Sequence, residues 1–290
     1  MEDKIINKLR YSLKDSHKYK SSYWKNLRYS EDLDDIYGHF GFGTFEKKTL
    51  IRNLAHTFFQ YLIYGKNLFK MSEFKILKNF YDKFNRQIDI DSIKHVFTFN
   101  FLKNKIGNPQ SISVIGDGKA NFVTCSYLNY PHSKIFSINL PEVLIHDYLI
   151  LKEYRIFRED EISVVTNEKD LEGSQKKLFL ISPDKVDLLQ NIKVDFYANL
   201  CSFQEIKYED IIKYFEIIKK HKALFYCCNR RSKILPGGEN IVFQDYPWGK
   251  GKNIVEGQCE WIKKIYFFRP PFIKSYDGPH DHKLISYNDR

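Results

Sequence analysis

Short polar or glycine-containing segments follow several apolar runs in this sequence, and their residue types suit the binding of a small organic cofactor. In "IGDGKAN", Gly116, Asp117 and Gly118 come directly after the apolar run at 112–115. Glycine lets the backbone approach a ligand, and the amides of a following helix face it. A dinucleotide fingerprint requires a third glycine where Asn121 stands. The loop therefore favours a cofactor without phosphates, such as S-adenosylmethionine, whose positive charges suit a nearby carboxylate; a plain strand-to-helix turn is the alternative.

A second candidate contact lies at the end of the next predicted strand. Asn139 stands 21 residues after Gly118, about where cofactor-binding folds place a side chain that hydrogen-bonds the ribose. A neutral amide makes a weaker contact with a ribose hydroxyl than a carboxylate does. We also expect Leu140, Thr166 and Asn199 to contact the cofactor, since each lies at or just after the end of a predicted strand.

These segments need a scaffold, which the sequence predicts as strands alternating with helices from residue 111 onward. Helices are expected at 142–153 and 208–221, and the second has acidic residues in its first turn and basic residues in its last, the order that the helix dipole favours. Strands separated by helices form a parallel sheet whose ligands bind beyond the carboxyl ends of the strands. The predicted fold is therefore a Rossmann-like, doubly wound α/β sheet. Its strands are expected at 112–115, 134–139, 162–166, 194–199 and 223–229, with a further candidate from Phe179.

The first 106 residues show a helical pattern instead. One helix is expected within residues 46–67, where apolar residues recur at every fourth position, and another from Ser72, a candidate cap. The aromatic and glycine-rich loop at 37–45 is expected to cover something. The sequence therefore predicts a helical N-terminal region at 1–106, which binds substrate or acts as a lid, and a cofactor-binding domain at 107–290. The apolar stripe consists of Leu50, Leu54, Phe58 and Leu62 beside Ile51, Ala55 and Phe59.

The composition limits the classes of partner and of site. The net charge is +10, but lysine and arginine are scattered, so we expect an anionic substrate rather than nucleic acid as the partner. Five cysteines without a C-x-x-C pair argue against a zinc site or a disulfide framework. The first residues lack the apolar core of a signal peptide, and the longest apolar run of the first half is too short to cross a bilayer. We therefore expect a cytoplasmic protein with no membrane span.

The run His280, Asp281 and His282 has residue types that bind metals. It lies close to the end of the sequence, where such runs are usually solvated. We therefore expect it to be solvated and assign no metal site.

Two longer segments add a family resemblance. "NLPEV" from Asn139 is similar to the D-L-P stretch that follows the second strand of several O-methyltransferases, with Asn in place of Asp. The segment from Val194 to Arg231 resembles the corresponding part of the sugar O-methyltransferases of bacterial polysaccharide and antibiotic gene clusters, and Trp24 and "YPWG" at 246–249 fall near that family's aromatic landmarks. The resemblance extends over roughly residues 20–270. It implies a class I methyltransferase fold, S-adenosylmethionine as cofactor, cofactor contacts from the glycine loop and Asn139, and a saccharide hydroxyl as acceptor.

Methyl transfer to a hydroxyl requires the two groups to be aligned and a proton to be removed as the oxygen attacks. Glu205 is the first candidate for the base, or for orienting the acceptor, because it follows the fourth predicted strand at the cofactor edge; a helix-capping role is the alternative. Asp245 and His146 are reserve candidates for the base. Polar residues after the fourth and fifth strands are expected to hold a sugar, free or linked to a nucleotide or phosphate. These expected acceptor contacts are Ser202, Gln204, Asn229 and Arg230, with a plain surface position as the alternative for the arginine.

Two alternatives to a sugar O-methyltransferase stay open. A nucleic-acid methyltransferase would fit the positive charge, although the sequence lacks the N-P-P-Y type of base-methylation motif, and its binding would weaken steeply with salt. A methyltransferase-like binding module without catalysis would fit Asn139 and the sparse glycine loop.

Overall fold

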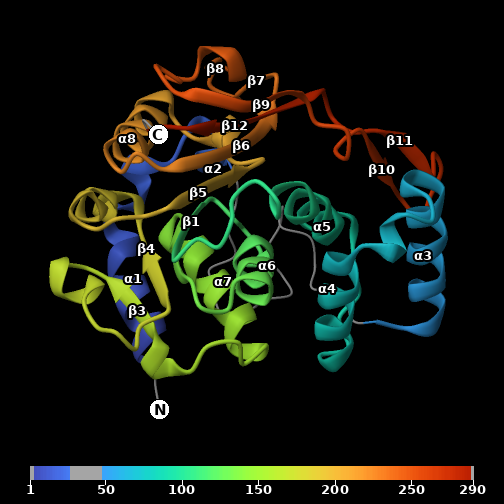
Figure 1. The fold of residues 1–290 in the computed structure, drawn as a ribbon, viewed down its shortest axis with the longest axis horizontal. Helices are drawn as coiled ribbons and strands as arrows, with labels where there is room; N and C mark the ends of the chain where they lie inside the picture. The colour runs from blue at the N-terminus through green and yellow to red at the C-terminus, as the bar shows by residue number, and fades with distance from the viewer. Residues whose placement is uncertain (1–2, 27–47, 289–290) are drawn as a thin grey trace.

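The computed structural model describes residues 3–26 and 48–288, and an eight-stranded sheet runs through them in the order β3-β4-β2-β1-β5-β6-β12-β9 (Figure 1). Neighbouring strands from β3 to β6 are parallel, whereas β12 runs antiparallel to both β6 and β9. Helices return the chain between most of the parallel strands, so the expected doubly wound α/β fold is confirmed. The strands are β1 (Ser111–Ile115), β2 (Lys134–Ile138), β3 (Ile162–Val165), β4 (Leu178–Ile181), β5 (Phe196–Leu200), β6 (Leu224–Arg230), β9 (Lys252–Gln258) and β12 (His280–Ser286).

The parallel strands all lie within two residues of their expected bounds. Their residues are nearly all buried, as continuous apolar runs predict for a parallel sheet. Strands β9 and β12 were not expected, because polar residues occupy most of both. The expectation that the run at 280–282 is solvated was wrong: His280, Asp281 and His282 are 1%, 6% and 7% exposed, because β12 lies between β6 and β9.

Two apolar clusters cover the two faces of the sheet. Because side chains alternate along a strand, Ile112 and Val114 of β1 join one cluster and Ile115 joins the other. The first cluster contains residues of α1, α4, α5, α6 and α7, and the second contains residues of α8. The helices are α1 (Lys4–Ser16), α2 (Ser22–Asn26), α3 (Leu50–Tyr64), α4 (Ser72–Lys83), α5 (Ile90–Leu102), α6 (Asn121–Asn129), α7 (Pro141–Glu153) and α8 (Tyr208–Lys220).

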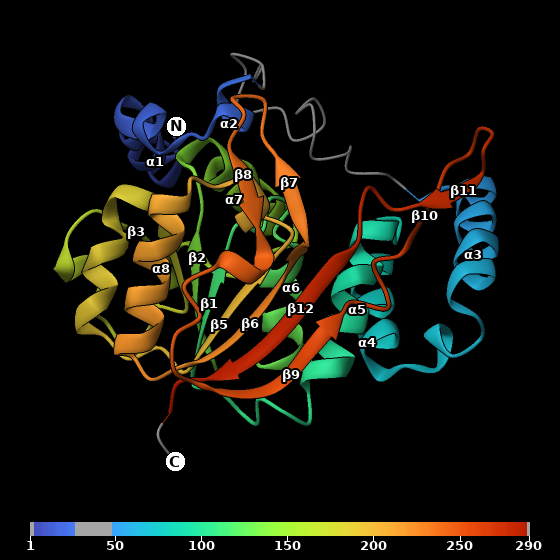
Figure 2. The ribbon, with the colours of Figure 1, turned by 90° about the horizontal axis from the view of Figure 1, so that it is seen from above.

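The N-terminal helices differ in how they join this core. Helices α1 and α4 contribute Leu9 and Leu77 to the same buried cluster as β1; α1 packs on α7 and β3, and α4 packs on α5 and α6. Helix α3 stands apart from the sheet, beside a hairpin of β10 (Lys264–Tyr266) and β11 (Ile273–Ser275) (Figure 2). The loop at 37–45, which was expected to cover something, lies outside the described residues.

A second small hairpin and the character of the helices complete the fold. A second small hairpin, of β7 (Ser232–Ile234) and β8 (Asn240–Val242), follows β6. Among residues 3–26 and 48–288, no helix has the length and apolar character needed to cross a bilayer.

Candidate functional site

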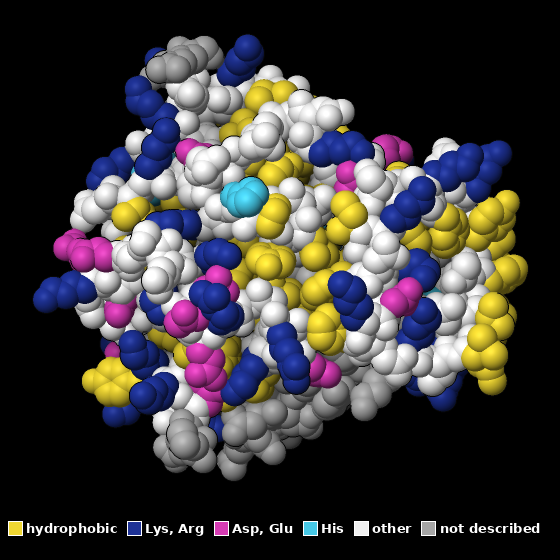
Figure 3. All heavy atoms as spheres, turned by 60° about the horizontal axis from the view of Figure 1, so that its bottom comes forward, with side chains coloured by type: hydrophobic (Ala, Val, Ile, Leu, Met, Phe, Trp, Pro, Cys, Tyr) yellow, Lys and Arg dark blue, Asp and Glu magenta, His cyan; other side chains and the backbone are white. Residues whose placement is uncertain are grey.

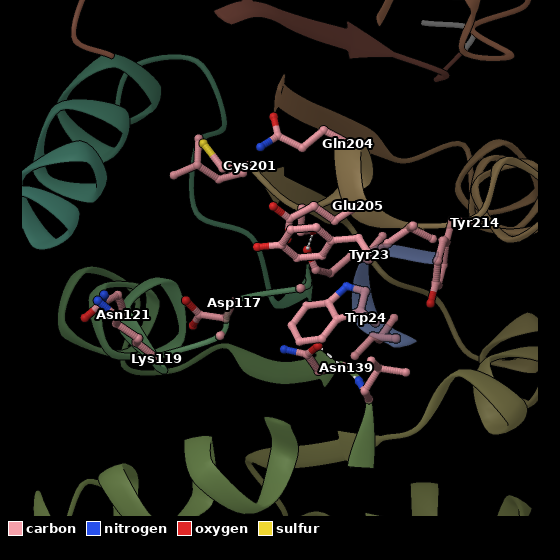
Figure 4. A pocket seen from close by; sticks show the side chains of 18 of the residues that line it. Tyr23, Trp24, Asp117, Lys119, Asn121, Asn139, Cys201, Gln204, Glu205 and Tyr214 are labelled. Carbon is pink, nitrogen blue, oxygen red and sulfur yellow. Dashed lines mark hydrogen bonds between the residues drawn. The ribbon is translucent and has the colours of Figure 1, made fainter. Parts of the chain in front are cut away.

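A cavity of about 340 Å³ opens at the carboxyl ends of the central strands. Pockets for small molecules typically have volumes of about 300–1,000 Å³. The chain passes from β1 to β2 on one side and reaches β5 on the other, and such a switch point is where doubly wound sheets bind ligands. The cavity is lined by nine of the residues expected from the sequence, which are Gly116, Asp117, Gly118, Asn139, Leu140, Ser202, Gln204, Glu205 and Arg230 (Figure 4).

Gly116 is the point where the loop after β1 meets the loop after β5. Its φ is +74°, and a Cβ atom there would lie 2.1 Å from Ser202 Oγ and 2.4 Å from Ser202 Cβ. The Ser202 hydroxyl donates a hydrogen bond to the carbonyl of Ile115 at 3.0 Å, which holds the two loops together. Glycine is therefore required at 116 by the packing of the two loops themselves.

The Asp117 carboxylate occupies the N-terminal amides of α6. Its oxygens accept hydrogen bonds from the backbone N–H groups of Phe122 at 2.9 Å and Val123 at 2.8 Å. Amides at the positive end of a helix are the groups that would otherwise bind a phosphate. Burial raises the pKa of Asp117 to about 6, against the lowering effect of these hydrogen bonds. The Asp117 carboxylate therefore occupies the position that a bound anion would take at the N-terminus of α6.

The turn from the loop into α6 is made by Ala120, the residue before Asn121. The two glycines of the loop have φ values of +74° and +79°, and Ala120 follows with a φ of +50°, a left-handed conformation that costs an alanine about 1–2 kcal/mol. The Ala120 N–H donates to Asp147 Oδ1 at 2.8 Å. Asn121 begins α6, and its side-chain oxygen accepts a hydrogen bond from Tyr81 at 3.0 Å.

Asn139 lies at the end of β2 and faces the Trp24 ring in Figure 4. Its Oδ1 accepts a hydrogen bond from the backbone N–H of Leu140 at 3.0 Å. Burial and the nearby Asp117 raise the pKa of Asp147 well above its usual range, and the Asn139 amide acts in the opposite direction. An aspartate at 139 would add a third carboxyl group to this buried pair, which gives a physical reason for the neutral amide.

Glu205 forms an ion pair with Lys233, whose Nζ lies 2.7 Å from Glu205 Oε1. Both side chains are largely buried, at 19% and 12% exposed. Burial raises the pKa of Glu205, and Lys233 and Arg230 lower it. The Lys233 ammonium also lies 4.1 Å from the centroid of the Tyr23 ring. Glu205 is thus a cavity carboxylate whose proton affinity is set by two opposing effects.

Asn199 and Asn229 lie behind the cavity, fully buried in the sheet. Asn229 Nδ2 donates to Asn199 Oδ1 at 2.7 Å, and Asn199 Nδ2 donates to the carbonyl of Ile115 at 2.9 Å. Next to them, Gln204 Oε1 accepts the backbone N–H of Arg230 at 2.7 Å. These bonds tie the carboxyl ends of β1, β5 and β6 together, so the two asparagines position the loops of the site.

Three other expected residues do not line the cavity. Thr166 follows the edge strand β3, separated from β2 by β4, and its hydroxyl donates to Asp170 at 2.6 Å. His146 is buried in α7, at 3% exposed. Asp245 is exposed in the 3-10 turn Phe243–Asp245, where its carbonyl accepts a hydrogen bond from Tyr208.

Helix α5 adds a charged cluster that the sequence analysis did not identify. Lys94 and Lys119, at 7% and 12% exposed, both bind Asp91, at 2.8 and 2.7 Å. Lys94 also donates to the Tyr276 hydroxyl at 2.7 Å. Burial lowers the pKa of the neighbouring His95 to about 3, so its ring is neutral at pH 7. Two ammonium groups share one carboxylate here, so this cluster by itself carries one net positive charge where it lines the cavity.

Aromatic residues of the N-terminal segment cover the cavity from the other side. Tyr23 and Trp24 of α2 line it, with ring centroids 5.8 Å apart and an edge-to-face arrangement. Ser21 Oγ donates to the carbonyl of Glu205 at 2.6 Å, and Ser22 Oγ donates to Glu239 at 2.7 Å. Trp24 was noted in the sequence only as a landmark, because no local pattern shows that α2 returns across the sheet.

No protein-family model matches the sequence, and no curated protein matches it. Solved structures similar to the chain include the N-methyltransferase NodS of Bradyrhizobium japonicum with S-adenosylhomocysteine, at 10% identity and a TM-score of 0.46, covering 69% of this chain and 88% of that one. Another is TrmK of M. capricolum with S-adenosylhomocysteine, at 14% identity and a TM-score of 0.40, covering 66% and 68%. A third is a fibrillarin/Nop5p complex, at 11% identity and a TM-score of 0.42, covering 70% and 85%. These sequence identities and TM-scores are too low to assign a function to the chain. The fold is established by the strand order described above.

Proposed function

We propose that the protein is an S-adenosylmethionine-dependent O-methyltransferase that acts on a hydroxyl of a sugar or sugar-derived acceptor. The observation that carries the proposal is the placement of Asp117. A cavity at the switch point of a doubly wound sheet calls for a nucleotide-like ligand, but the Asp117 carboxylate already occupies the α6 amides that a phosphate would need. An adenosyl cofactor without phosphates meets both conditions.

The cavity residues suit the parts of this cofactor. Asn139 and Leu140 lie at the end of β2, where the ribose and the base bind in such sheets. The surplus charge of Lys94 and Lys119 suits the carboxylate of the methionyl part, and the Asp117 carboxylate favours its positive groups. Trp24 offers an aromatic face to the adenine.

The acceptor would enter on the side of the loops after β5 and β6. When bound, the cofactor supplies a methyl group on sulfonium sulfur; the acceptor oxygen forms a bond to that carbon as the carbon–sulfur bond breaks, and S-adenosylhomocysteine leaves. Glu205 is the proposed acceptor of the hydroxyl proton, because burial raises its pKa toward the working range of a base. Arg230, 19% exposed and paired with Asp277 at 2.7 Å, suits an anionic group on the acceptor.

Titration calorimetry of the full chain with S-adenosylmethionine and S-adenosylhomocysteine tests the cofactor. We expect binding of both, and no binding of ATP or NADH, because Asp117 already occupies amides of α6 that a phosphate would need. Absence of heat with both sulfur compounds at high micromolar concentration, or tighter binding of ATP, would overturn the cofactor assignment. Trp24→Phe should retain binding and lose the cofactor-dependent change in tryptophan fluorescence, since Trp248 and Trp261 do not line the cavity.

Transfer of a labelled methyl group to a panel of sugars, nucleotide sugars and nucleic acids tests the reaction. Glu205→Gln should reduce transfer to a sugar by about 10²–10⁴-fold, the usual contribution of a general base. Asp245→Asn, at an exposed carboxylate outside the cavity, is the matched control and should leave the rate unchanged. Salt-sensitive transfer to RNA or DNA alone would favour the nucleic-acid alternative, and tight cofactor binding without transfer to any acceptor would favour the non-catalytic one.

A further inference from the structure

Helix α3 buries polar side chains and exposes apolar ones, the reverse of an ordinary amphipathic helix. Its two buried side chains are the polar His56 and Gln60. Its large apolar side chains point outward instead, and soluble proteins rarely expose a contiguous apolar stripe of this kind without using it. These exposed residues and their exposed fractions are Leu50 77%, Ile51 82%, Leu54 61%, Phe58 58%, Tyr61 54% and Leu62 52%.

The hairpin of β10 and β11 extends this apolar surface and fixes its orientation. His56 Nδ1 and the Tyr266 hydroxyl share a hydrogen bond of 2.6 Å, and Gln60 Nε2 donates to the same hydroxyl at 3.2 Å. The Phe59 ring stacks on Tyr266 with centroids 5.5 Å apart. At the tip of the hairpin, Phe267, Phe268 and Phe272 are 38%, 45% and 49% exposed. Residues 48–70 and 261–275, called the wing below, thus expose apolar side chains on both the helix and the hairpin, and apolar side chains gather at the right edge of Figure 3.

The wing is also uniformly basic. It contains no aspartate or glutamate, but eight lysines and arginines. Lys48 and Lys263 pair with acidic residues outside the wing, Asp82 and Glu260. The remaining six make no ion pair with any residue in 3–26 or 48–288. These six are Arg52, Lys66, Lys70, Lys264, Arg269 and Lys274.

We propose that the wing is a docking surface for an anionic lipid bilayer, on which the protein lies peripherally. Helix α3 itself contains one basic residue, Arg52, and the other lysines and arginines of the wing flank it. An exposed leucine and phenylalanine stripe with basic residues around it is the combination that inserts into the headgroup boundary, with lysines meeting lipid phosphates. Helix α3, at 15 residues and about 22 Å, has the length to lie in that boundary. The cavity lies elsewhere, since no residue of the wing lines it.

Charge argues against a second copy of the chain as the partner of the wing, and the exposed apolar residues argue against a nucleic acid. A second copy packed wing to wing would bring six cationic side chains that have no acidic partner within 3–26 or 48–288 against six others, and no carboxylate of the wing would offset them. A nucleic acid would satisfy the charge, but it offers no apolar layer to Leu50, Ile51, Leu54 and Leu62. Of these three occupants, the surface of an anionic membrane is the one that supplies both negative charge and hydrocarbon.

Sedimentation of the full chain with vesicles tests the proposal. We expect binding to phosphatidylcholine vesicles containing about a third phosphatidylserine, weak binding to pure phosphatidylcholine, and weaker binding as salt increases. Lys66→Glu with Lys70→Glu should weaken binding to the anionic vesicles by at least about thirty-fold, since each basic residue contributes about 1 kcal/mol. Leu54→Ser with Phe58→Ser should weaken it by at least about tenfold.

Matched controls lie outside the wing. Ile234→Ser, at an apolar residue 74% exposed in β7, and Lys250→Glu with Lys252→Glu, at exposed lysines, should leave vesicle binding unchanged. All variants alter exposed residues, and unchanged far-ultraviolet circular dichroism and cofactor heat would establish that they fold.

Three results would overturn the proposal. The first is no binding to anionic vesicles at low salt. The second is a micromolar dimer that the Leu54→Ser and Phe58→Ser double variant dissociates, which would assign the wing to a second copy. The third is RNA binding that is lost in the lysine variant and unaffected in the apolar one, which would assign it to nucleic acid.

Discussion

Replacing Gly116 by alanine perturbs a close contact between the loops after β1 and β5. At a φ of +74° the alanine costs about 1–2 kcal/mol for the left-handed conformation. Its Cβ would also stand 2.1 Å from Ser202 Oγ, and forced overpacking of this kind adds about 1–3 kcal/mol. We therefore expect Gly116→Ala to lower the free energy of unfolding by about 2–5 kcal/mol, measured by urea denaturation. The same displacement of Ser202 should weaken binding of S-adenosylhomocysteine.

Two further variants separate these two contributions. Gly107 has a φ of +60°, and a Cβ atom there would meet nothing within 4 Å, so Gly107→Ala should show the conformational cost alone, about 1–2 kcal/mol. Gly116→Ala combined with Ser202→Gly removes both atoms that the new Cβ meets, so the pair should couple favourably by about 1–3 kcal/mol. If Gly116→Ala were no more costly than Gly107→Ala, the close approach of the two loops would be wrong.

Two predictions concern the buried charges. The folded pKa of Asp117 is raised from 3.8 to about 6, so the folded protein holds this proton more tightly than the unfolded chain does. The resulting stability, about 3 kcal/mol, is present below pH 3.8 and is lost as the pH rises to 6. Asp117→Asn should remove this part of the pH dependence of urea unfolding, and an unchanged profile would contradict the prediction. Asp91→Asn leaves Lys94 and Lys119 without their carboxylate and should lower the free energy of unfolding by about 3–5 kcal/mol. Lys119→Met keeps the Lys94–Asp91 pair and should lower it by less. Equal decreases in the two urea unfolding curves would show that the lysines do not share Asp91.

The six parallel strands of the sheet could be predicted because they are buried on both faces. Runs such as Ile112–Ile115 are then apolar nearly throughout and stand out from the helices between them. The two antiparallel strands, β9 and β12, lack this signal, and β9 is exposed along nearly its whole length. In β12, Lys283 is buried because it reaches Glu256 at 3.0 Å and lies 4.8 Å from the centroid of the Trp248 ring, contacts that only the folded chain creates.

The residues of the candidate site also fall into a group that the sequence could place and a group that it could not. Residues that follow parallel strands could be placed from the sequence, because the carboxyl ends of those strands meet at one edge. Trp24 and Lys94 could not, because helices α2 and α5 precede the sheet in the chain and reach the cavity only through tertiary packing. For α3, the helical period was found correctly, but a period reports which side chains share a face and not whether that face is covered.

The attachment of the α2 segment has a kinetic consequence. Three hydrogen bonds hold it to the rest of the site: Ser21 Oγ to the Glu205 carbonyl, Ser22 Oγ to Glu239, and Gly237 N–H to Ser22 Oγ at 2.9 Å. At about 1 kcal/mol each, these three bonds alone would leave roughly one molecule in a hundred with this segment released, and the contact of Tyr23 with Lys233 lowers that fraction. Such local opening takes microseconds to milliseconds. The departure of a spent ligand from beneath Trp24 would then be timed by the hydrogen bonds of the buried Ser21 and the half-buried Ser22, and the turnover rate with it.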